Sequence, residues 1–182
     1  MKIKLLIAVL ALQSAWILGT SFQQERLLNA GREILLETQP VDPRDLLRGD
    51  FVRLNYTISD IPREKFLPAV TNELPADKTV YVALALSGTN QFWNVTRASL
   101  NKISPEGGEV ILRGKSEWSW RSGSGFVRVE YGLEKYFVAE GTGNPRGKLT
   151  VQAVVSNSGK ASIKEVFING KPYAEAMREQ GH

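Results

Sequence analysis

The chain begins with an uncharged, mostly apolar run and then changes to a pattern in which apolar and polar residues alternate. The run LLIAVLALQSAWILGTSF covers Leu5 to Phe22 and follows Lys2 and Lys4. A helix needs about 20 predominantly apolar residues to cross a bilayer, and basic residues stay on the cytoplasmic side. We therefore predict a transmembrane helix over residues 1–22 with the body outside the cytoplasm, in the periplasm of a Gram-negative source.

This apolar run has two interpretations, a retained signal anchor and a cleaved signal peptide. The apolar core of a signal peptide spans about 7–15 residues before a small-x-small cleavage site. Here Trp16, Ile17 and Leu18 lengthen the apolar core, and Gly19-Thr20-Ser21 is only a tolerable cleavage site. The length favours an anchor in the inner (plasma) membrane, and the question of cleavage stays open.

After the anchor, residues 23–32 are predicted to form a short helical stalk, and residues 33–182 a single extracytoplasmic β domain. The alternation typical of a strand with one solvated face is clearest at residues 52–58. Further runs rich in β-forming residues are Thr79–Leu86, Phe92–Leu100, Glu109–Trp120, Phe126–Tyr131, Tyr136–Ala139, Leu149–Ser156 and Ala161–Ile168.

Turn signals separate these runs, and few segments favour a helix. Asn157-Ser158-Gly159 fits a tight hairpin between the last two strands, and Pro172–Glu179 fits a short closing helix. This spacing predicts an all-β fold, mainly an antiparallel sandwich or a partly open barrel, with the N-terminal transmembrane helix and a few short helical turns.

Composition removes several classes of function. The net charge of +4 includes Lys2 and Lys4, so the body carries +2, too little and too scattered for binding nucleic acid. The chain has no cysteine, which excludes disulfides, thiolate nucleophiles and sulfur-ligated zinc. Its one histidine is His182, at the end of the chain, so neither a Ser-His-Asp triad nor a histidine metal site is expected. We expect no metal and no cofactor.

The segment before residue 51 reads as a capped helical turn that leads into a strand. Asp42 suits the N-cap, Pro43 the first helical position, and Asp45 the third, where a carboxylate favours the helix dipole. Gly49 suits the left-handed residue that ends a helix, and Asp50 then opens the strand. Every residue of the segment thus has a structural explanation.

The longer segment PVDPRDLLRGDFVRLNY (Pro40–Tyr56) resembles the signature of the GDYXXLXY proteins, with Phe51 in place of the usual tyrosine. The resemblance extends to YGLEKYFVAEGTG (Tyr131–Gly143) and SIKEVFINGKPY (Ser162–Tyr173). It implies a membrane-anchored bacterial protein without an assigned activity, often encoded near multi-pass membrane proteins. Since Phe51 lacks a hydroxyl, the ring is expected to pack rather than react. The signature residues that we take as a structural or binding site are Asp42, Pro43, Arg44, Asp45, Gly49, Asp50, Phe51, Leu54 and Tyr56.

These observations favour a membrane-anchored binding domain, an accessory subunit of a membrane complex whose partner is a multi-pass membrane protein. No catalytic residue is assigned. One alternative is a carboxylate-dependent hydrolase of envelope glycans, because paired carboxylates can cleave glycosidic bonds. The candidate carboxylates are the cluster Asp42, Asp45 and Asp50 and the group Glu130, Glu134 and Glu140 that flanks the second motif. Another is a passive glycan-binding module, because Trp118 and Trp120 would share one face of a strand.

Overall fold

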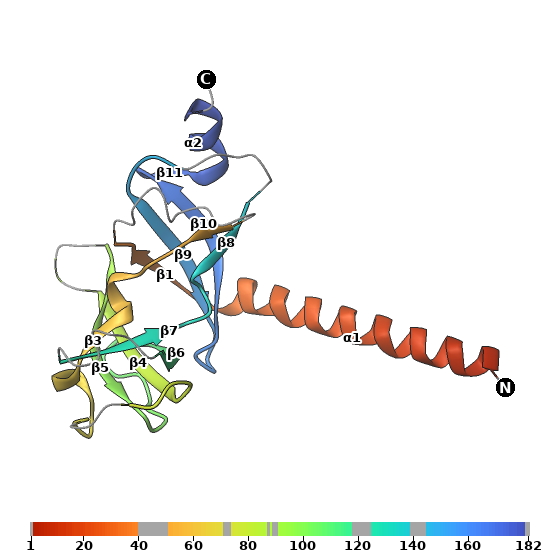
Figure 1. The fold of residues 1–182 in the computed structure, drawn as a ribbon, viewed down its shortest axis with the longest axis horizontal. Coiled ribbons are helices and arrows are strands. Elements are labelled where there is room, and N and C mark those ends of the chain that lie inside the picture. The colour runs from red at the N-terminus through yellow and green to blue at the C-terminus, as the bar shows by residue number, and fades with distance from the viewer. Residues whose placement is uncertain are drawn as a thin grey trace.

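The computed structural model describes residues 2–39, 51–70, 74–86, 88, 91–117, 125–138 and 145–180, without the side chains of residues 2, 3, 8 and 21–30. A long N-terminal helix, α1 (Lys2–Ala30), extends away from a β body that contains the strands (Figure 1). The helix runs without a break past residue 22, where we predicted the boundary between anchor and stalk. Among the described residues, no helix combines the length and the hydropathy that crossing a membrane requires.

Three antiparallel sheets make up the described part of the β body. Their orders are β1-β9-β10-β11, β2-β8 and β3-β7-β6-β4-β5. The mainly antiparallel β fold predicted from alternation is therefore confirmed. The strands are β1 (Arg32–Glu37), β2 (Phe51–Arg53), β3 (Asp60–Pro62), β4 (Thr79–Leu86), β5 (Trp93–Ser99), β6 (Val110–Glu117), β7 (Phe126–Glu130), β8 (Lys135–Phe137), β9 (Leu149–Val155), β10 (Ala161–Ile168) and β11 (Lys171–Pro172). The remaining elements are the 3-10 turns η1 (Thr57–Ser59) and η2 (Arg63–Lys65) and the helix α2 (Tyr173–Gln180).

One hydrophobic core draws on all three sheets. Its members include Val151 of β9, Val52 of β2 and Leu112 of β6, each with no exposed surface. Alternate residues of a strand face opposite sides of the sheet, so period-two positions such as these supply the buried face. The Asn157-Ser158-Gly159 turn joins β9 to β10 as predicted, and the two strands pair in antiparallel register.

The strand predicted over residues 52–58 is wrong in its length. β2 ends at Arg53, Tyr56 forms an isolated bridge with Thr38, and η1 then closes through a hydrogen bond from the Ser59 amide to the Tyr56 carbonyl at 3.1 Å. Every second side chain from residue 52 to residue 58 is nevertheless buried. The alternation of apolar and polar residues therefore predicted burial correctly. It did not predict that the backbone leaves its pairing with β8 after Arg53.

Candidate functional site at the signature segment

The signature residues fall into two groups. Phe51, Leu54 and Tyr56 belong to the described structure, and with the residues between them they form what we call the signature segment, residues 51–56. The capped turn predicted before it and the tryptophan pair lie outside the described residues. The sites affected are Asp42, Pro43, Arg44, Asp45, Gly49, Asp50, Trp118 and Trp120.

The signature segment alternates between the core and the surface. Val52, Leu54 and Tyr56 have no exposed surface. Phe51 and Asn55 are half-buried on the opposite side. Val52, Leu54 and Tyr56 are thus core residues, which accounts for their spacing of two without any chemical role.

Two tyrosine hydroxyls join the signature segment and Ile58, which follows it in η1, to residues 131–133 at the beginning of the second family motif. The Tyr56 hydroxyl donates to the Leu133 carbonyl at 2.6 Å, and the Tyr131 hydroxyl donates to the Ile58 carbonyl at 2.7 Å. In addition, the Leu54 amide donates to the Glu134 carbonyl at 2.8 Å. The two segments therefore hold each other through reciprocal bonds inside the core, where such bonds are shielded from water.

These tyrosines are not suited to acid-base chemistry. Burial raises the pKa of Tyr56, and the negative charge of Glu134 raises it further. Burial likewise raises the pKa of Tyr131, with Glu134 adding to the shift. Both phenols thus stay protonated at physiological pH and act as hydrogen-bond donors.

Arg128 of β7 contacts polar groups from three other segments. Its guanidinium donates to both carboxylate oxygens of Asp60 at 3.1 and 3.2 Å and to Oδ1 of Asn55 at 3.0 Å. Glu117 of β6 forms a longer ion pair with it at 3.9 Å. The Arg128 and Asp60 side chains are only 18% and 12% exposed. Loss of either charge would leave its partner poorly solvated, so this cluster holds the signature against β3 and β6.

A group of glutamates lies beside this cluster. Burial raises the pKa of Glu130, and the charges of Glu117 and Glu134 raise it further, while Arg53 of the signature acts in the opposite direction. The carboxylate of Glu134 accepts the Tyr131 amide at 2.6 Å and is thereby committed to the backbone. Within the described residues, no group of acidic or histidine side chains is arranged to hold a metal ion.

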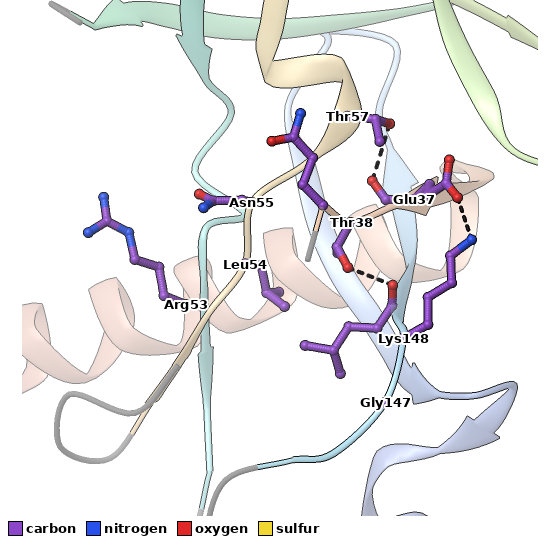
Figure 2. A pocket seen from close by; sticks show the side chains of 10 residues that line it. Glu37, Thr38, Arg53, Leu54, Asn55, Thr57, Gly147 and Lys148 are labelled. Atoms are coloured by element: carbon purple, nitrogen blue, oxygen red, sulfur yellow. Dashed lines mark hydrogen bonds and ion pairs between the residues drawn. The ribbon is translucent and has the colours of Figure 1, made fainter. Parts of the chain in front are cut away.

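A cavity of about 540 Å³ opens where the signature segment meets β1 and the start of β9 (Figure 2). Lys148 forms an ion pair with Glu37, and the Thr38 hydroxyl donates to the Leu149 carbonyl at 2.6 Å. Arg53 lies across the cavity from the Lys148 ion pair in Figure 2. Most of its polar lining is therefore already bonded within the protein. The lining residues are Glu37, Thr38, Gln39, Arg53, Leu54, Asn55, Thr57, Gly147, Lys148 and Leu149.

The outward side of β2 and β8 carries aromatic rings. Phe51 and Phe137 are paired across the two strands, with ring centroids 6.1 Å apart in an edge-on arrangement. Lys135 places its ammonium 5.2 Å from the centroid of the Phe51 ring. Phe51 thus packs against a neighbouring ring and under an ammonium group.

Sequence reasoning did not select Arg128, Lys135 or Phe137. The available signal was the alternation within FVRVE and KYF, which puts these residues on the face opposite the core. Their contacts with the signature required knowledge of the strand pairing, which alternation does not give.

Comparison with known proteins gives one result for the family and none for individual proteins. The family model described as GDYXXLXY protein matches residues 13–166, which is most of the chain. Neither the comparison with curated proteins nor that with solved structures found a match. The chain therefore belongs to the GDYXXLXY protein family, as the resemblance of its signature predicted.

Proposed function

We propose that the protein is a membrane-anchored binding domain, an accessory subunit whose β body works outside the cytoplasm. The observation that carries this proposal is the exposure of the apolar side chains along α1. Nine large apolar residues of this helix are between 44% and 75% exposed. They are Leu5, Leu6, Ile7, Val9, Leu10, Leu12, Trp16, Ile17 and Leu18.

Such a surface is unfavourable in water, because each exposed apolar Å² costs about 25 cal/mol relative to burial. Contiguous apolar surface in a soluble protein marks a contact with a membrane or with another protein. A helix suits lipid because it satisfies its own backbone hydrogen bonds. We therefore base membrane insertion on the exposure of these side chains. Lys2 and Lys4 precede them, which would keep the N-terminus cytoplasmic and the β body on the far side.

A binding role is supported by how the polar groups of the signature are used. The carboxylate of Asp60 is paired with Arg128, and the hydroxyls of Tyr56 and Tyr131 are bonded to backbone carbonyls. Side chains that are committed to such bonds hold the fold rather than a substrate, which favours a binding role over catalysis at the signature. The partner that we propose is a multi-pass membrane protein, held at high effective concentration by the shared membrane.

The proposal is tested by alkaline carbonate extraction of membranes, followed by protease treatment of spheroplasts. An inserted α1 keeps the full chain in the membrane pellet, and external protease digests the body while leaving a small membrane-bound stub. Release of the full chain by carbonate, or protection of the body from protease, would contradict the proposal. Purification from detergent-solubilised membranes with reversible cross-linking then identifies the partner.

A glycan hydrolase is a second candidate, favoured by the environment of Glu130. A carboxyl group whose pKa is raised by burial and by Glu117 suits a general acid, with a neighbouring carboxylate as base. If this is the function, Glu130→Gln abolishes release of sugar fragments from envelope glycan while the variant stays folded and at least as stable as the parent protein at neutral pH. Equal release by the parent protein and the variant would eliminate this candidate.

A further inference from the structure

We propose that the outward face of β2 and β8 docks on the anionic head-group surface of a lipid bilayer. We call this face the ribbon face and define it as Phe51, Arg53, Lys135 and Phe137. The inference rests on the proposed anchor, because α1 is what would bring the β body to the membrane. It adds the orientation of the body on the bilayer and the lipid chemistry that the body recognises.

The strand register creates the ribbon face. Phe51 pairs with Phe137, and Arg53 pairs with Lys135, so all four side chains share one side of the two strands. The alternating pair, Val52 and Tyr136, faces the core. The ribbon therefore has one side fixed in the protein interior and one side that presents two rings and two cations.

Exposure distinguishes this face from a packed surface. Phe137 is 73% exposed, the highest exposed fraction among the large apolar side chains described in the β body, and Arg53 and Lys135 are exposed as well. The contact of Phe51 with Phe137 and Lys135 keeps the rings and the ammonium together. Glu134 accepts the Tyr131 amide, and Glu130 interacts with Glu117 as well as with Arg53, so Lys135 is the cation on which the charge of the ribbon face chiefly depends.

This combination matches the chemistry of a membrane interface. Aromatic rings enter the boundary between head groups and acyl chains, while basic side chains reach back to lipid phosphates. Each basic residue near an anionic surface strengthens the contact about fivefold. In Figure 1, β8 borders the side of the β body from which α1 extends, so the helix and the ribbon face can meet the same bilayer.

The test uses the full chain in nanodiscs of phosphatidylcholine, with or without phosphatidylglycerol. Since the chain has no cysteine, Phe137→Cys provides a single site for an environment-sensitive fluorophore. Leu100→Cys is the control position. Trp93, the first residue of β5, contacts Arg32 near the end of α1, whereas Leu100 follows the last residue of β5. Position 100 therefore lies at the end of β5 that is remote from α1. Quenching by lipids that carry a spin label near the head group reports contact with the bilayer.

We expect quenching at position 137, stronger with phosphatidylglycerol, and none at position 100. Lys135→Glu in the Phe137→Cys background reduces the effect of phosphatidylglycerol about fivefold or more, whereas Lys102→Glu, an equal change of charge at another exposed lysine, leaves it unchanged. Equal quenching at the two positions in both compositions, with the chain held in the discs, overturns this inference alone. Quenching at 137 that requires native membranes also overturns it, in favour of a protein partner. Failure of the chain to enter the discs overturns the anchor and this inference together.

Discussion

At the scale of single residues, the signature is held by hydroxyl groups in the core. The Tyr56 hydroxyl donates to the Leu133 carbonyl. Both residues are buried, so water cannot replace the hydroxyl as the donor to this carbonyl. We predict that Tyr56→Phe lowers the free energy of unfolding by about 1–2 kcal/mol, because a buried carbonyl loses its donor. Denaturant unfolding in detergent micelles measures this loss. Tyr81→Phe, at a half-buried position of β4, is the matched control, and an equal loss in both variants would contradict the prediction.

Glu130 gives the protein a pH dependence of defined sign. Burial and the charges of Glu117 and Glu134 raise its pKa above the usual 4.5, so the folded state holds this proton more tightly than the unfolded state. The contribution of Glu130 to the free energy of unfolding therefore falls as the pH rises from about 4.5 through the raised pKa.

We predict that Glu130→Gln removes this fall, so that the variant gains stability relative to the parent protein as the pH rises through that interval. Thermal melts at about pH 4 to pH 8 measure the difference in stability between the variant and the parent protein. Glu64→Gln, in the exposed part of η2, is the control and should track the parent protein. A constant difference between Glu130→Gln and the parent at every pH would refute the assignment.

At the scale of elements, β6 depends on a glycine that lets two strands approach. A Cβ built on Gly114 would lie 2.4 Å from Cγ1 of Val129 and 2.6 Å from the Glu130 carbonyl oxygen. The carbonyl belongs to the backbone of β7 and cannot rotate away. We predict that Gly114→Ala destabilises the protein by about 2 kcal/mol or more, since relief requires the paired strands to separate.

The same substitution in α1 provides the comparison for Gly114. Gly19 is helical and has no atom within 4 Å of an added Cβ, so Gly19→Ala should be neutral or slightly stabilising. Both variants are measured by denaturant unfolding of the full chain in micelles. If Gly114→Ala and Gly19→Ala have the same free energy of unfolding, β6 and β7 are less closely packed than the contacts at Gly114 indicate.

The longer strands could be predicted from sequence because their alternation is regular and turn residues mark their ends. The predicted bounds of β4 and β10 agree with the structure for this reason. β1 was not predicted, because the run Ile34-Leu35-Leu36 interrupts the alternation directly after a helix. β3 was missed because it has only three residues and ends in proline.

The candidate site was predictable only in part. The family signature identified Phe51, Leu54 and Tyr56, and alternation explains the burial of the last two. The bond from Arg128 to Asn55 joins residues 73 positions apart, so it depends on the order of strands in the sheets. Local patterns carry no information about such an order, which is why this contact appeared only with the structure.

At the scale of the whole molecule, the β body has its own core, and α1 meets it only at the C-terminal end of the helix (Figure 1). Within the described structure, α1 contacts β9 and β10. Val154 of β9 has no exposed surface yet stands outside the core cluster, because it faces the side opposite Ala153 and Val155. The last turns of α1 are the element available to cover that side.

Two truncations separate the anchoring role of α1 from this structural role. The side chains that deletion of residues 2–22 removes are exposed wherever the structure describes them. We predict a body that is soluble without detergent and whose free energy of unfolding stays within about 0.5 kcal/mol of the full chain. Deletion of residues 2–30 also removes the turns over β9 and β10 and should cost about 1–3 kcal/mol, the scale of exposing one buried valine.

Val154→Ala in each truncated form identifies the cause of the difference. If the end of α1 covers Val154, the substitution costs more stability in the protein that lacks residues 2–22, where Val154 is still covered. It costs less in the protein that lacks residues 2–30, where the side chain is already exposed. The four proteins are the two truncated forms, each with and without Val154→Ala. Denaturant unfolding measures the free energy that the substitution costs in each truncated form, and the difference between the two costs. Equal stability of the two truncations would mean that α1 is a tether only. A difference that persists unchanged in the Val154→Ala background would place the stabilising contact elsewhere on β9 or β10.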